Sequence, residues 1–88
     1  MDARLILYNL HACPECQSIR EKLAELELTY ICVNVSPAKA KRTQVFELTG
    51  QYSVPVLVDG ETILTSADNI LEYLVETYAH NVIKPVKY

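Results

Sequence analysis

The sequence Cys13-Pro14-Glu15-Cys16 lies between an apolar run at residues 5–8 and a helical pattern that begins at Pro14. Proline suits the first position of a helix, because its missing N–H has no intrahelical partner there and its φ is already helical. Backbone N–H groups and the helix dipole favour negative charge at this end, so we expect Cys13 to ionise more readily than a free cysteine. Cys16 lies one turn further on and is expected to be carried toward the core, where it suits a resolving role. We therefore expect Cys13 to be the reactive thiol.

Two other interpretations of this thiol pair stay open. One is half of a zinc site with His11 as a third ligand, although Cys32 and His80 are isolated in the sequence and supply no second pair. The other is a pair of packing cysteines without chemistry. A Cys-x-x-Cys pair at a strand-to-helix junction favours redox chemistry over both, so no metal site is predicted. Cys32 lies inside a β-rich run, and we expect it to be a buried packing thiol that reacts after Cys13.

Length and composition indicate a single globular domain over residues 1–88. Half of the 88 residues are hydrophobic and the net charge is −3, which gives no electrostatic footprint for nucleic acid or an anionic membrane. No apolar run approaches membrane-spanning length, and the first residues show no signal-peptide pattern. Three cysteines are an odd number, unlike the even framework of a secreted disulfide scaffold. We expect a cytoplasmic monomer, since in a reducing compartment a Cys-x-x-Cys pair is more often catalytic than structural.

Hydrophobic periodicity predicts the element order β-α-β-α-β-β-α. The second helix is expected to begin at Ser36-Pro37 and to end before Gly50, and its basic residues are expected to form a solvated face or a weak anionic docking patch. Thr65 or Ser66 is expected to cap the third helix. The predicted strands cover residues 4–9, 28–35, 54–58 and 62–64, and the predicted helices cover residues 14–27, 36–49 and the segment after the last cap.

These elements define an α/β fold with a four-stranded mixed sheet and helices on both faces. A right-handed crossover makes the first two strands parallel, and the Asp59-Gly60 turn makes the last two antiparallel. The thiols would lie where the first strand ends, the usual place for a site in an open α/β sheet. Val54-Pro55 opens the third strand, where proline removes no ladder hydrogen bond. A cis bond there would turn the backbone outward beside the thiols to bind an extended peptide, and a plain strand start is the alternative.

The sequence resembles glutaredoxins and, equally, the thioredoxin-fold N-terminal domain of glutathione transferases. The resemblance covers residues 4–79 and implies a thioredoxin-like fold. By this resemblance Cys13 is the nucleophile, Cys16 is the resolving cysteine and Pro55 is a cis proline. Glu15 stands where dithiol glutaredoxins usually carry tyrosine. The matching positions are Leu7-Tyr8, Cys13-Pro14, Cys16, Arg20, Gly50-Gln51, the run from Val54 to Gly60, and the run from Ile70 to Leu74.

The same resemblance implies glutathione as co-substrate. Gln51 matches the polar position that contacts the glycine carboxylate of glutathione, and Val54 would pair through its backbone with the cysteine of the tripeptide. Asp68 matches the aspartate that receives the γ-glutamyl ammonium, while Ser66 and Ala67 would offer N–H groups to the neighbouring carboxylate, as a helix N-terminus can. Ordinary helix capping is the alternative for Ser66 and Asp68.

We therefore expect a glutathione-dependent thiol–disulfide oxidoreductase that reduces protein disulfides or glutathione mixed disulfides. Its partners would be glutathione and disulfide-containing or glutathionylated proteins. One alternative is a non-redox glutathione-binding module that resembles a free-standing transferase N-terminal domain. Another is an iron–sulfur carrier, which some glutaredoxins are through a site-cysteine thiolate and bound glutathione.

Overall fold

The computed structural model describes residues 4–79, and its strands and helices follow the predicted order. The expectations for residues 1–3 and for His80 and the residues after it lie outside the described part. The strands are β1 (Leu5–Asn9), β2 (Tyr30–Asn34), β3 (Val56–Asp59) and β4 (Thr62–Leu64). The α-helices are α1 (Pro14–Glu25), α2 (Thr43–Thr49) and α3 (Ala67–Tyr78), and a short 3-10 helix, η1 (Lys39–Lys41), precedes α2.

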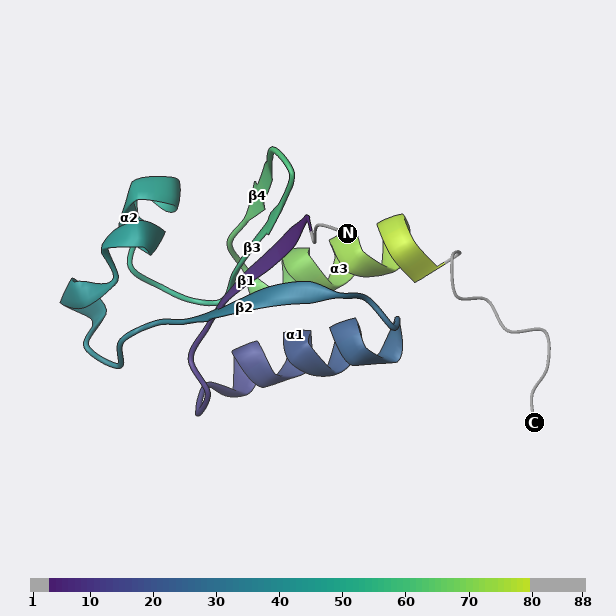
Figure 1. Ribbon diagram of the computed structural model, residues 1–88, viewed down its shortest axis with the longest axis horizontal. Helices are drawn as coiled ribbons and strands as arrows, with labels where there is room; N and C mark the ends of the chain where they lie inside the picture. Colours follow the sequence, from purple (N-terminus) through teal and green to yellow (C-terminus); the bar gives the residue numbers. More distant parts are fainter. Residues whose placement is uncertain (1–3, 80–88) are drawn as a thin grey trace.

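The four strands form one mixed sheet in the order β2-β1-β3-β4 (Figure 1). β1 runs parallel to β2 and antiparallel to β3, and β3 runs antiparallel to β4. Leu7 in the centre of β1 is fully buried and pairs with Leu57 of β3. The predicted four-stranded mixed sheet is thus confirmed. β1 is one of its two inner strands, so the loop that follows β1 begins at the middle of one end of the sheet.

The main core lies between the sheet and the two long helices, α1 and α3, which cover the same face (Figure 1). Side chains at alternate positions of β1 point into this layer, as the period of a strand requires. None of the helices within residues 4–79 is long and apolar enough to cross a membrane. The buried members of the core are Leu5, Leu7, Ile19, Leu23, Leu26, Leu57, Ile70 and Leu74.

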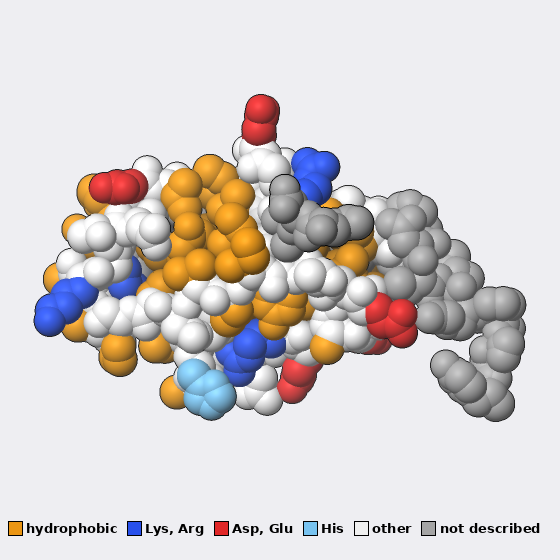
Figure 2. Space-filling view, viewed as in Figure 1, with side chains coloured by type: hydrophobic (Ala, Val, Ile, Leu, Met, Phe, Trp, Pro, Cys, Tyr) orange, Lys and Arg blue, Asp and Glu red, His pale blue; other side chains and the backbone are white. Residues whose placement is uncertain are grey.

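The opposite face of the sheet is only partly covered. Val45 of α2 packs against Tyr8 and Val56 at one end, so helices do lie on both faces as predicted. Further along this face, the side chains of Ile31 and Ile63 remain 48% and 41% exposed. Figure 2 shows hydrophobic side chains gathered between α2 and the β3–β4 hairpin. The short α2 therefore leaves part of an apolar sheet face open.

The prediction of one helix over residues 36–49 is wrong in its first half. Ser36 does not cap a helix, because its hydroxyl oxygen accepts the N–H of Ala38 in a turn (3.1 Å). Arg42 separates η1 from α2 with a non-helical φ of −90° and ψ of 62°. Its guanidinium donates to the carbonyl oxygens of Ser36 (2.8 Å) and Tyr52 (3.0 Å), which ties this loop to the segment before β3. The end of the helix is as predicted, since Gly50 adopts the left-handed region at φ 78°.

The prediction that Cys32 is a buried packing thiol is wrong. Cys32 lies in β2, which is an edge strand and shorter than the predicted residues 28–35. Its partner across the ladder, Leu7, is fully buried, whereas Cys32 itself is exposed. A β-rich run of residues does not show whether the strand lies at the centre or at the edge of a sheet, and this decides the burial.

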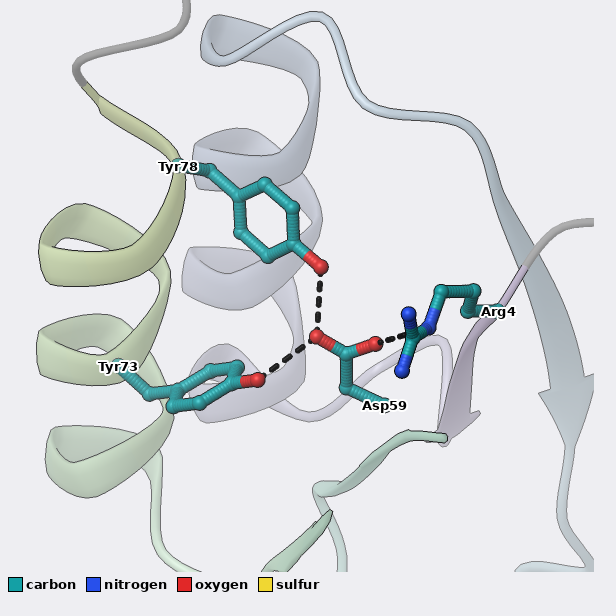
Figure 3. Close-up of polar contacts among 4 residues, drawn as sticks. All are labelled: Arg4, Asp59, Tyr73 and Tyr78. Carbon is teal, nitrogen blue, oxygen red and sulfur yellow. Dashed lines mark hydrogen bonds and ion pairs between the residues drawn. The ribbon is translucent and has the colours of Figure 1, made fainter. Parts of the chain in front are cut away.

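A buried carboxylate joins the end of β3 to α3 (Figure 3). The Oδ2 atom of Asp59 accepts the hydroxyl groups of Tyr73 (2.7 Å) and Tyr78 (2.5 Å). Its Oδ1 atom lies 3.2 Å from Nε of Arg4, an ion pair whose geometry does not make a hydrogen bond. Gly60 follows at φ 63°, and a Cβ there would collide with the Arg4 guanidinium. The Asp-Gly turn thus anchors α3 as well as reversing the chain.

The two tyrosines predict a loss of stability at alkaline pH. Burial, followed by the hydrogen bond to Asp59 and its charge, raises the pKa of Tyr78 to about 12, and the same causes raise the pKa of Tyr73. The folded protein holds these protons more tightly than the unfolded chain, so their stabilisation is complete below about pH 10 and is lost as the pH rises toward about 12. Urea unfolding across this range is expected to show a falling free energy of unfolding. Tyr78→Phe should flatten the decline, and an equally steep decline in that variant would contradict the assignment.

Candidate functional site

Cys13 occupies the N-cap position of α1, with Pro14 at the first helical position as predicted. Its backbone is extended (φ −82°, ψ 120°), and its N–H donates to the carbonyl of Leu10 at 3.0 Å, which closes a tight turn after β1. The Cys13 carbonyl accepts the N–H of Gln17 at 3.0 Å and so begins the helical ladder. The side chain is half-buried. This geometry leaves the sulfur at the mouth of the helix with access to solvent.

Cys16 is fully buried one turn further along α1, as predicted. Burial raises the pKa of its thiol to about 11; the N–H of Leu10, which donates to the sulfur at 3.4 Å, opposes this shift, and the neighbouring Cys13 adds to it. Near neutral pH, very little of Cys16 is therefore present as a thiolate. The two thiols are therefore close enough to interact, but Cys16 is a poor nucleophile.

Arg20 fixes the loop between β1 and α1. Its guanidinium donates to Oδ1 of the buried Asn9 (2.5 Å) and to the carbonyl of His11 (3.3 Å). Asn9 in turn donates its amide to Oδ1 of Asn34 on β2 (2.9 Å). Arg20 lies on α1, so these bonds clamp the loop that carries Cys13 against both the helix and the sheet. The charge of Arg20 also lowers the pKa of Cys16, although burial outweighs it.

Two adjoining cavities open beside Cys13. The first has a volume of about 280 Å³, and the second has about 300 Å³. Both are lined by Glu15, Ser53 and Val54, so they form neighbouring parts of one groove. The other residues of the first cavity are Leu10, Cys13, Lys39 and Arg42. The other residues of the second cavity are Pro55, Thr65, Ser66, Ala67 and Asp68.

Most of the residues predicted from the family resemblance come together in this groove. Val54 reaches both cavities, and the Val54–Pro55 bond is cis, as predicted. Ser66 caps α3 by accepting the N–H of Asn69 at 3.1 Å, with Asp68 in the first turn. Ser66 therefore does cap α3, and the residues at the start of the same helix also line the second cavity.

Two of the predicted site residues do not line the groove: Cys16, which is buried in the core, and Gln51. Gln51 is exposed and lines neither of the two cavities. Its backbone N–H and carbonyl both bond to the hydroxyl of Thr49 at 3.1 Å, just after α2. The role of Gln51 remains a prediction.

Lys39 and Arg42 are the basic residues of the groove that the sequence did not place at the site. Both belong to the helix predicted over residues 36–49, whose basic residues were expected to form a solvated face or a weak anionic docking patch. Instead, Arg42 is only 6% exposed, Lys39 lies on η1, and both line the cavity of Cys13. Helical periodicity could not find them, because the chain there is not one helix. Within residues 4–79, no three His, Cys, Asp or Glu side chains are grouped so as to hold a metal ion.

The three cysteines are expected to differ in their rates of alkylation. A pKa of about 11 in place of 9.0 lowers the thiolate fraction of Cys16 about 100-fold, and burial also shields its sulfur. Cys13 and Cys32 should therefore be labelled first, and Cys16 only when the chain unfolds. Peptide-resolved mass spectrometry after iodoacetamide treatment at neutral pH, with and without urea, measures this. Labelling of Cys16 in the folded protein as fast as that of Cys13 would show that the helix start is open.

Comparisons with known proteins agree with this architecture. The profile of the family described as "Glutathione S-transferase, N-terminal domain" matches residues 7–82. A solved glutathione transferase homolog from Drosophila mojavensis, with bound glutathione, is 28% identical with a TM-score of 0.80, and the match covers 88% of this chain and 36% of that one. No curated protein sequence matches the chain.

Two other solved structures are similar over the same region. Glutathione transferase E6 from Drosophila melanogaster is 33% identical with a TM-score of 0.78, over 84% of this chain and 34% of that one. A diazinon-metabolizing glutathione S-transferase from the silkworm Bombyx mori is 26% identical with a TM-score of 0.79, over 92% of this chain and 40% of that one. The chain thus spans 34% to 40% of the length of these relatives.

Proposed function

Because the chain belongs to the glutathione S-transferase N-terminal domain family, we propose that it binds glutathione and catalyses thiol–disulfide exchange at Cys13. The observation that carries the proposal is the half-buried Cys13 thiol at the N-cap of α1, in the wall of a groove that continues to the start of α3. The homolog from Drosophila mojavensis, which holds glutathione, supports the choice of ligand.

We propose that glutathione lies along the groove with its γ-glutamyl group at the start of α3. There the backbone N–H groups of Ser66 and Ala67 would donate to the γ-glutamyl carboxylate, since a helix N-terminus favours negative charge. The Asp68 carboxylate would bind the γ-glutamyl ammonium. Val54, which reaches both cavities, would hold the cysteine of glutathione by its backbone, beside Pro55 and within reach of Cys13. Gln51 would contact the glycine carboxylate from the loop after α2.

The proposed reaction is the reduction of a glutathione mixed disulfide. The Cys13 thiolate attacks the glutathione sulfur, the S–S bond breaks, and the substrate leaves as a thiolate that takes a proton from solvent. A second glutathione thiolate then attacks the Cys13–glutathione disulfide, which gives glutathione disulfide and restores Cys13. Cys16 could also resolve this intermediate, but its raised pKa leaves little thiolate to do so. We therefore assign resolution to glutathione and place glutathionylated proteins ahead of protein disulfides as substrates.

A glutathione-binding module without redox turnover is the second candidate. It is favoured by the family match, because the relatives are described as transferases. We propose that residues 1–88 fold as one domain and that the protein is a cytoplasmic monomer; the Cys-x-x-Cys pair and the odd cysteine count favour a reducing compartment.

The test is a coupled assay with a glutathionylated peptide, glutathione, glutathione reductase and NADPH. If the protein is an oxidoreductase, the rate of NADPH consumption should depend on the protein concentration and should saturate as the peptide concentration rises. Calorimetric titration with glutathione alone supplies the comparison. Binding without turnover would support the module instead, and the absence of both would refute the glutathione assignment.

A further inference from the structure

Glu15 has a position in the groove that the proposed function does not use. It lies in the first turn of α1 and is exposed, and it lines both the Cys13 cavity and the cavity at the start of α3. Within residues 4–79, its carboxylate makes no hydrogen bond or ion pair. The first turn of a helix accounts for an acid at this position, but not for its place where the two cavities meet.

The other charged groups of the groove are distributed unevenly. Glu15 and Asp68 are the charged residues of the second cavity, which no Lys or Arg lines within the described residues. Lys39 and Arg42 line the first cavity together with Glu15. The Arg42 guanidinium is committed to backbone carbonyl oxygens, at 2.8 Å from Ser36 and 3.0 Å from Tyr52, and the residue is only 6% exposed. Among the residues that line the Cys13 cavity, the exposed charges are therefore those of Glu15 and Lys39.

Bound glutathione would leave the Glu15 carboxylate without a partner. In the proposed placement, the single ammonium of glutathione pairs with Asp68. The γ-glutamyl carboxylate of glutathione lies at the N-terminus of α3, and its glycine carboxylate lies at the side of the groove near α2. Because Glu15 and Cys13 line the same cavity, the protein half of a mixed disulfide at Cys13 would lie near the Glu15 carboxylate. The carboxylate would attract a cationic group on that half and repel an anionic group, and added salt would weaken both effects.

We propose that Glu15 determines substrate specificity by selecting mixed disulfides whose protein half carries Lys or Arg beside the glutathionylated cysteine. This inference rests on the proposed function. The expected preference for a basic over an acidic substrate is about threefold to tenfold in kcat/KM at low ionic strength, and it shrinks as salt is added.

Two glutathionylated peptides of equal length, one with lysines and one with glutamates beside the cysteine, test the inference. Glu15→Gln should lower the basic-to-acidic ratio of kcat/KM toward one, whereas Lys39→Gln should raise it. Glu21→Gln is the matched control, because Glu21 lies on the same helix, bonds to Gln17 and lines neither cavity. A ratio in Glu15→Gln equal to that of the unaltered protein overturns the inference.

A second measurement needs no glutathione and so separates the two proposals. Cationic and anionic methanethiosulfonate reagents are applied to a Cys32→Ser background, where the Cys13 thiolate displaces a sulfinate to form a mixed disulfide. The cationic reagent should react faster, and Glu15→Gln should reduce its advantage while Glu21→Gln should not. If neither peptide is turned over, the proposed function fails, and the ratio of the cationic to the anionic reagent rate then tests the inference alone. An unchanged ratio in Glu15→Gln overturns the inference as well.

Discussion

Cys13→Ser is expected to lower kcat/KM for a glutathionylated peptide by more than about 100-fold. Sulfur attack on a disulfide requires a thiolate, and a serine hydroxyl stays protonated near neutral pH and attacks sulfur poorly. The half-buried position of Cys13 at the groove makes it the thiol that a bound disulfide would meet. The coupled reductase assay measures the loss, and glutathione binding by calorimetry should be largely retained.

The matched variant Cys16→Ser separates a one-thiol from a two-thiol route. With a pKa of about 11, Cys16 supplies little thiolate, so glutathione resolves the intermediate and the variant should keep its activity within about threefold. The Cys32→Ser variant should behave like the unaltered protein, because Cys32 lies on the edge strand and lines neither cavity. A loss in Cys16→Ser as large as that in Cys13→Ser would show that the buried thiol is needed for turnover and that the dithiol mechanism holds.

Asp59→Ala is expected to lower the free energy of unfolding by about 2–4 kcal/mol. The substitution removes the acceptor for the hydroxyls of Tyr73 and Tyr78 and the anionic partner of Arg4 in one step. It also leaves a space beside α3, since Asp59 is only 4% exposed. Urea unfolding followed by circular dichroism measures the change.

Single tyrosine variants apportion this loss. Tyr73→Phe or Tyr78→Phe should each cost about 1 kcal/mol, because the other hydroxyl still donates to Oδ2 of Asp59. Glu72→Ala, an exposed acid on the same helix, should be close to neutral. A loss below about 1 kcal/mol in Asp59→Ala would mean that solvent satisfies both hydroxyls and that the anchor contributes little.

Local signals in the sequence predicted those parts of the fold that depend on neighbouring residues. Pro14 and Gly50 mark helix ends through local backbone effects, because proline has a φ already fixed for a helix start and glycine adopts a left-handed φ without strain; both ends are as predicted. The Asp-Gly turn likewise fixed the β3–β4 hairpin. The start predicted at Ser36 failed because a distant contact, from Arg42 to the carbonyl of Tyr52, holds the chain in a turn.

The residues of the candidate site likewise include some that the local sequence predicts and others that only tertiary contacts place there. Cys13 and Cys16 could be located from spacing alone, since a helix converts that spacing into one sulfur at its mouth and one in the core. Lys39 and Arg42 could not, because their place in the groove depends on how η1 packs beside the loop before β3. The exposure of Cys32 and the pairing of Asp59 with two tyrosines of α3 also arise from tertiary contacts between segments far apart in the sequence.

The exposed thiol on the edge of the sheet gives redox titrations of this protein an internal standard. In the folded, reduced protein a small disulfide reagent reaches Cys13 and Cys32, while Cys16 is closed off. Exchange with glutathione disulfide converts Cys13 to a disulfide with glutathione or, after a second exchange, with Cys16, and releases glutathione. This removes one of the two signals and leaves the signal of Cys32 as the reference. The fraction oxidised can then be obtained from a ratio within one sample, without a separate determination of protein concentration.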